Sequence, residues 1–219
     1  MTDGGAMTGP TILPEAIYDE LRARIIDQSY APGESITESA VAERFDVARP
    51  TAKMAIERLV AEGILRREAH RAARVPQLDA ADVVDLFDNR AIVESAAVAK
   101  LATEGILPAA AIAANRAIAA SKNFASHDIA FHRALVAGQP SPRLAKLHDA
   151  LMGEIELCIG QVQAAHLLTA AEVSEQHQGI LDAILAGDAA RASQLSNEHI
   201  AGSRDRLATS INKDIAESI

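Results

Sequence analysis

Three histidines and one aspartate in the second half of the chain have the residue types and spacing of metal ligands. Asp128 and His132 are four residues apart in a segment with helical periodicity, so both side chains project from one helix face. His177 and His199 fall in two later helical segments. Neighbouring helices in a bundle would bring these groups together around a divalent metal ion. From spacing alone the simpler alternative is stronger, in which Asp128 and His132 form an ordinary surface or core pair.

A second chemical feature is a basic segment in a chain whose net charge is −9. Residues 44–76 carry eight basic and four acidic side chains, a local charge of +4. Because salt screens charges beyond about 10 Å, the local field matters more to a phosphate than the net charge does. The segment therefore predicts a phosphate-binding surface, although a solvated helix face is an equally good interpretation of charge alone.

Length and composition indicate an ordinary helical protein. Of 219 residues, 49% are apolar and 23% charged, and aromatic residues make up only 3%, which favours closely packed helices. The single Cys158 excludes a disulfide framework and a multi-cysteine zinc ribbon. No run of about 20 apolar residues and no signal sequence is present. We expect a cytoplasmic protein without membrane association and with a disordered leader at residues 1–10.

The first third of the chain has the pattern of a winged helix-turn-helix, which the expected domain of residues 11–76 would form. The expected elements are helices at 12–28, 37–45 and 49–62, a strand at 64–65 and a hairpin at 66–74. Thr37 is the expected N-cap of the second helix. In this plan the helix that starts at Arg49 enters the DNA major groove, and the hairpin lies on the backbone or in the minor groove.

Beyond a short linker at Pro76, helical periodicity continues to the end of the chain. The expected helices are 79–104, 108–122, 124–138, 141–166, 170–186 and 188–215, with breaks at Gly105, at residues 139–142 and at Gly187. The fold class is thus mostly α. Residues 77–219 are expected to form an all-α antiparallel helical bundle.

Several short motifs in the first third resemble the GntR family of bacterial transcriptional regulators. They are Tyr30-Ala-Pro-Gly-Glu34, Glu38-x-x-Val41-Ala42, Phe45-Asp-Val-Ala-Arg49, Ile56-x-x-Leu59 and Glu62-Gly63-Ile64-Leu65. The resemblance implies DNA binding; Arg49 matches a family contact position, and Lys53 stands where arginine is common. Ala48 replaces the usual N-cap serine, which predicts a loss of about 1 kcal/mol in helix stability. The candidate DNA-binding residues are Arg44, Arg49, Thr51, Lys53, Arg58, Arg71 and Arg74.

The second part resembles the FCD ligand-binding domain of the FadR subfamily. The similarity rests on Asp128-x-x-x-His132, on His177 and His199, and on Arg90-x-x-x-Glu94. It implies that the first four hold a divalent metal ion such as Zn, Ni or Mn. It also implies that Arg90 can bind an anionic effector, with a salt bridge to Glu94 or Asp128 as the alternative. Asn115 and Arg133 are polar candidates for the same effector pocket.

The combined expectation is a transcriptional regulator, not an enzyme. A small carboxylate effector would bind at the metal-containing pocket and control the affinity for DNA, with repression as the expected outcome. Homodimerisation is expected because paired heads read a palindromic operator. Two alternatives remain: the metal itself is the sensed signal, or the site is a metal-dependent hydrolase or lyase. An enzyme would leave the basic winged helix unexplained.

Overall fold

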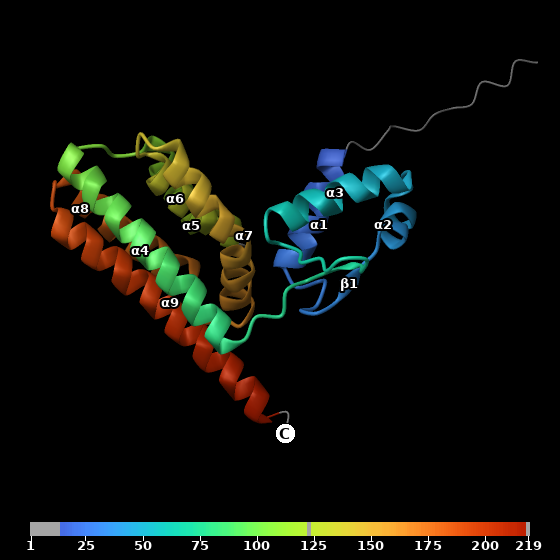
Figure 1. The fold of residues 1–219 in the computed structure, drawn as a ribbon. Helices are drawn as coiled ribbons and strands as arrows, with labels where there is room; N and C mark the ends of the chain where they lie inside the picture. Colours follow the sequence, from blue (N-terminus) through green and yellow to red (C-terminus); the bar gives the residue numbers. More distant parts are fainter. Residues whose placement is uncertain (1–13, 122–123, 218–219) are drawn as a thin grey trace, which may run out of the picture.

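The computed structural model describes residues 14–121 and 124–217. The leader expected at residues 1–10, the start of the first expected helix at Ile12 and the end of another at Lys122 lie outside the described residues. Figure 1 shows two bodies, a small one that contains α1 to α3 with both strands, and a larger one of long helices from α4 to α9. The mostly helical fold class is confirmed.

The small body is built from short elements around an apolar centre. They are α1 (Pro14–Ile26), β1 (Ser35–Ile36), α2 (Glu38–Phe45), α3 (Arg49–Ala61) and β2 (Ala73–Arg74). The side chain of Thr37 caps α2 by accepting a hydrogen bond from the Ala40 amide at 3.2 Å, as expected. Ala48 is the N-cap of α3, where its methyl group cannot accept such a bond. Leu21 on α1 and Ile56 and Leu59 on α3 are fully buried, so one apolar stripe joins these two helices.

The wing differs from the expectation. The strand expected at Ile64–Leu65 is wrong, because both side chains are only 1% exposed and therefore do not alternate between core and solvent as strand residues do. The ladder instead joins Arg66 to Arg74 and pairs β1 with β2 in antiparallel register. The β1 strand was missed because two residues after a Pro-Gly turn carry no periodic signal.

The large body consists of six helices whose breaks fall where Gly and Pro predicted them. They are α4 (Ala80–Glu104), α5 (Ala109–Ala120), α6 (Ala125–Ala137), α7 (Pro142–Ala164), α8 (Ala170–Leu185) and α9 (Ala189–Glu217). Gly105 and Gly187 have φ of 66° and 72°, the left-handed conformation that ends a helix and that glycine adopts without strain. In Figure 1 the first helix of the bundle, α4, runs along the last, α9, and the two are in contact.

The two bodies touch through α7, which is the bundle helix nearest to the small body in Figure 1. A single apolar cluster includes Ile25 and Ile26 of α1 together with Leu157 and Ile159 of α7. The small body is therefore packed against the bundle, and α7 forms the wall that they share. Within the described residues, no helix is long and apolar enough to cross a membrane.

Candidate metal centre and nucleic-acid interface

Three helices bring the candidate metal ligands together in the bundle core. Asp128 and His132 lie one turn apart on α6, His177 lies on α8 and His199 on α9. The start of α6 is held by Gln163 of α7, whose side-chain oxygen accepts hydrogen bonds from the backbone amides that precede Asp128. All four ligand residues are buried, with exposures from 0% to 4%. The sequence therefore placed these residues correctly on three neighbouring helices.

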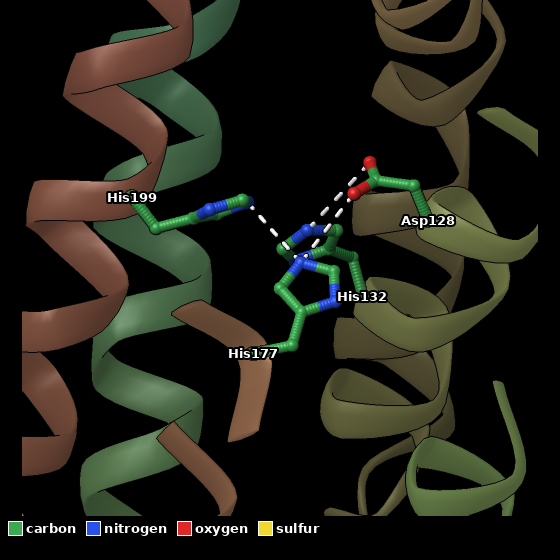
Figure 2. A group of neighbouring side chains, drawn as sticks. All are labelled: Asp128, His132, His177 and His199. Atoms are coloured by element: carbon green, nitrogen blue, oxygen red, sulfur yellow. Dashed lines mark hydrogen bonds and ion pairs between the residues drawn. The ribbon is translucent and has the colours of Figure 1, made fainter. Parts of the chain in front are cut away.

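The four side chains point toward a common centre (Figure 2), and each offers one ligand atom within 4.8 Å of the others. His177 Nε2 is 3.3 Å from His199 Nε2 and 3.4 Å from Asp128 Oδ1. His132 Nε2 is 3.8 Å from Asp128 Oδ2. These separations match those between atoms that share one ion at the usual metal–ligand distances of about 2.0–2.2 Å.

Each imidazole is oriented from behind by a neighbouring side chain. His132 Nδ1 lies 2.6 Å from Glu94 Oε2, and His199 Nδ1 donates to Gln176 Oε1 at 2.7 Å. The ring of Phe131 stacks on that of His177, with centroids 3.7 Å apart and planes at 8°. Such partners fix the tautomer and the ring direction, so the Nε2 atoms of His132 and His199 face the centre.

The electrostatics keep the ligands in a metal-binding form. Burial, together with the other histidines and Arg90, lowers the pKa of His177 and of His199 well below the ordinary value, so both imidazoles are neutral near pH 7. Burial raises the pKa of Asp128, although His132 and Arg90 oppose the shift. A buried carboxylate beside neutral imidazoles gains from a cation that neutralises it.

Two further observations test whether a metal ion fits. Within the described part of the chain, Asp128 Oδ2 and His132 Nε2 are buried without a hydrogen-bond partner. Orphaned buried acceptors are rare and costly, and a shared cation would satisfy both. Three imidazoles and one carboxylate are also the donor set that Zn²⁺, Ni²⁺ and Mn²⁺ accept. The residues present fit a divalent transition metal.

The three expected effector residues occupy different environments. Arg90 is fully buried on α4, and its Nε donates to Glu94 Oε1 at 2.9 Å. Its two terminal nitrogens have no hydrogen-bond partner among the described residues. Asn115 of α5 is buried and donates to the carbonyl of Ser174 on α8. Arg133 instead lies on the outer side of α6 in a partly exposed ion pair with Asp149, so the structure does not bring it to the metal ligands.

Two residues next to the site had drawn little notice from the sequence. Glu94 accepts hydrogen bonds from Arg90 and from His148 Nε2, the latter at 2.8 Å, besides its approach to His132. The i,i+4 spacing of Arg90 and Glu94 was visible in the sequence, but His148 of α7 had no signal beyond its residue type. Arg90, His132 and His148 hold the pKa of Glu94 well below its usual value despite complete burial.

The expected DNA contacts are most convincing at the start of α3 and in the wing. Arg49 and Lys53 are exposed one turn apart on α3, Thr51 is half-buried between them, and Arg44 is exposed in the last turn of α2. Arg49 also lines a hollow of about 300 Å³ between α2 and the wing. That hollow includes two wing arginines, Arg67 and Arg71, of which Arg67 was not among the expected contacts.

The remaining two expected contacts have other partners. Arg58 lies nine residues after Arg49, half a turn around α3, and its guanidinium sits 3.8 Å from the centre of the Tyr18 ring. It also donates to Glu62 at 3.1 Å. Arg74 of β2 donates to the Gly33 carbonyl at 3.1 Å. The structure therefore does not place Arg58 on the face that carries Arg49 and Lys53.

Comparison with known proteins agrees with both halves of this description. GlaR, an HTH-type transcriptional repressor of Escherichia coli K12, is 27% identical over 199 residues, 84% of this chain and 90% of its own length. The HTH-type transcriptional regulator BphR of Paraburkholderia xenovorans LB400 is 25% identical over 205 residues, 87% of this chain and 83% of its own.

Solved structures share the fold along most of the chain. A GntR regulator from Rhodococcus sp. RHA1 aligns with a TM-score of 0.68 at 24% identity, covering 89% of this chain and 96% of its own. McbR/YncC of E. coli aligns with a TM-score of 0.68 at 18% identity, covering 91% and 98%. Residues 13–75 match the bacterial regulatory proteins of the gntR family, and residues 85–202 match the FCD domain. The chain therefore belongs to the GntR family of bacterial transcriptional regulators, as a member whose C-terminal part is an FCD domain.

Proposed function

We propose that this regulator is a cytoplasmic repressor whose affinity for its operator is set by a small organic acid at a metal-containing pocket. Residues 11–76 would bind DNA, and residues 77–219 would bind the effector and form the homodimer. The observation that carries the proposal is the buried cluster of Asp128, His132, His177 and His199, with the unpaired guanidinium nitrogens of Arg90 close enough to act on the pKa values of its members. The printed name of GlaR supports repression.

The chemistry of the pocket favours an anionic ligand. A divalent ion held by four protein groups offers its remaining coordination positions to oxygen donors such as a carboxylate. The terminal nitrogens of Arg90 are two buried charged donors without protein partners in the described residues, and they suit bidentate recognition of a carboxylate. Asn115 contributes to the pocket wall through α8, and Arg133 is the weakest of the candidate effector residues because Asp149 engages it.

The metal site is tested by elemental analysis of the purified protein. We expect about one divalent ion per chain in the wild type and none in His177→Gln, because that imidazole lies at the centre of the cluster. His127→Gln is the matched control, since His127 lies on α6 directly before Asp128 but is not one of the clustered ligands. Unchanged metal content in His177→Gln would remove the site.

DNA binding and effector binding need separate measurements. Fluorescence anisotropy with the duplex upstream of the chain's own gene should give an affinity that falls linearly with the logarithm of salt concentration. A panel of small carboxylic acids should then raise the melting temperature of the zinc-loaded protein, because a ligand of the folded state stabilises it by about 2.7 kcal/mol at 100 times its Kd. Failure to bind this DNA at any salt concentration would sink the proposal.

A second candidate function is direct metal sensing, which the same buried cluster supports. It predicts that operator affinity follows the free concentration of zinc or nickel and ignores organic acids. The hydrolase alternative has less support, because the nearest further carboxylate, Glu94, is engaged by Arg90, His132 and His148 and is thus not free to accept a proton from water.

A further inference from the structure

We propose that α7 transmits the state of the metal centre to the DNA-binding body, with Glu94 and His148 as the positioning residues of the relay. The inference rests on the proposed function, since it names the route by which that function is regulated. It joins two features of α7, a buried hydrogen bond at one turn and a close backbone contact at the next turns.

The first feature is the carboxylate of Glu94, which links a metal ligand to α7. One of its oxygens lies 2.6 Å from Nδ1 of His132, and the other accepts a hydrogen bond of 2.8 Å from Nε2 of His148. All three side chains are no more than 1% exposed, so water does not compete for these contacts. A change in the position of His132 must therefore be followed by Glu94 and His148, or leave charged atoms buried without partners.

The second feature is the opposite use of two faces of α7. His148, Met152, Ile155 and Ile159 repeat at helical spacing and are buried on the bundle side. Gly153, Glu156 and Gly160 also share one face, about a third of a turn around the same helix. A movement of α7 driven at His148 is thus a movement of the face that carries the two glycines.

That glycine face is the seat of the DNA-binding body. A Cβ atom on Gly153 would lie 2.7 Å from the carbonyl carbon of Glu62 and would overlap its oxygen, and one on Gly160 would lie 2.5 Å from the carbonyl oxygen of Ile26. Only glycine lets the helix approach the ends of α3 and α1 this closely. Contact between backbones leaves little play, so a shift of α7 moves both ends directly.

Ion pairs flank the seat and hold its register. Arg22 of α1 pairs with Glu156, whose side chain is fully buried, and Arg66 at the base of the wing pairs with Glu154 at 2.5 Å. Breaking a buried pair leaves an uncompensated charge, so the DNA-binding body is unlikely to slide while it stays docked. The orientation of α3 and of the wing relative to the bundle is consequently set by α7.

Hydrogen-exchange mass spectrometry on the full-length protein tests the relay, with saturating Zn²⁺ as the probe. In the wild type we expect Zn²⁺ to slow exchange in α6 and α8, and also at residues 58–65, by about fivefold or more, the lower end of ordinary coupling between sites. His148→Leu keeps the volume but loses the donor. It should keep the effect in α6 and α8 and lose it at residues 58–65. His148→Gln retains a side-chain N–H donor and should restore the effect.

The outcomes separate the relay from the function on which it rests. Equal Zn²⁺ effects at residues 58–65 in wild type and His148→Leu, or none in the wild type, would overturn the relay. So would a His148→Leu protein that no longer shows protection in α6 and α8, since His148 would then support metal binding itself. A protein that shows the expected pattern but binds no DNA would keep the relay and refute the proposed function.

Discussion

Replacing Gly153 by alanine should destabilise the protein although it improves a helix. Alanine is better than glycine inside a helix by about 1 kcal/mol. Against this, the new Cβ would lie 2.7 Å from the carbonyl carbon of Glu62, an atom of the backbone that cannot rotate away. Overpacking of this kind costs about 1–3 kcal/mol, and a backbone neighbour favours the upper end. The net loss is therefore about 2 kcal/mol, which in a chain of this size lowers Tm by about 4–8 °C.

Thermal unfolding followed by circular dichroism measures this effect, and Gly179→Ala is the matched control. Gly179 also lies inside a helix, but a Cβ there would meet only Leu195 Cδ1 at an ordinary 3.7 Å. That variant should therefore gain about 1 kcal/mol and melt about 2–4 °C above the wild type. Gly160→Ala, with its nearest atom at 2.5 Å, should fall between the wild type and Gly153→Ala. If Gly153→Ala melts together with Gly179→Ala, the close seat on α7 does not exist.

Three further predictions concern capping, DNA contacts and pH. Ala48→Ser should stabilise the protein by about 1 kcal/mol in thermal unfolding, because the hydroxyl can cap α3; no gain would mean that the helix start is already satisfied. Arg49→Ala should make the salt dependence of DNA affinity shallower by about 0.9 in logarithmic slope, whereas Arg58→Ala, which faces Tyr18, should leave that slope unchanged. Burial raises the pKa of Cys158 to about 12. The unfolded thiol ionises near pH 8.5 and the folded one does not, so raising the pH above that value favours unfolding by up to about 1.4 kcal/mol per pH unit. Urea unfolding from pH 8 to 10 should show this decline in wild type, and a smaller one in Cys158→Ala.

Most of the fold could be predicted because its signals are local. Thr37 caps α2, and Gly105 and Gly187 end helices in the left-handed conformation, as their residue types indicate. The wing was harder to predict. Ile64 and Leu65 are as apolar as strand residues, yet they follow the turn at Gly63 and both point into the core. Their placement depends on packing against α7, which no local pattern reveals.

The candidate metal ligands were found from the sequence, but their supports were not. Asp128 and His132 stand four apart, and a shared helix face follows from that spacing alone. Glu94 and His148 meet only because α4 and α7 are adjacent in the bundle. Their sequence separation of 54 residues carries no periodic signal. The same holds for Arg58, whose type suggested phosphate binding until its place beside Tyr18 was known.

The pairing of α4 with α9 bears on the order in which the protein is made. The helix that opens the bundle rests on the helix that closes it, so the bundle lacks a long side of α4's packing until the last residues leave the ribosome. The small body, by contrast, is complete within its first 75 residues and makes its own contacts close in sequence. Because local contacts form first and domains fold as units during synthesis, we expect the DNA-binding body to fold while the sensor is still being translated. His199, which α9 supplies, is the last ligand to arrive, and a nascent chain therefore acquires its metal only near the end of its own synthesis.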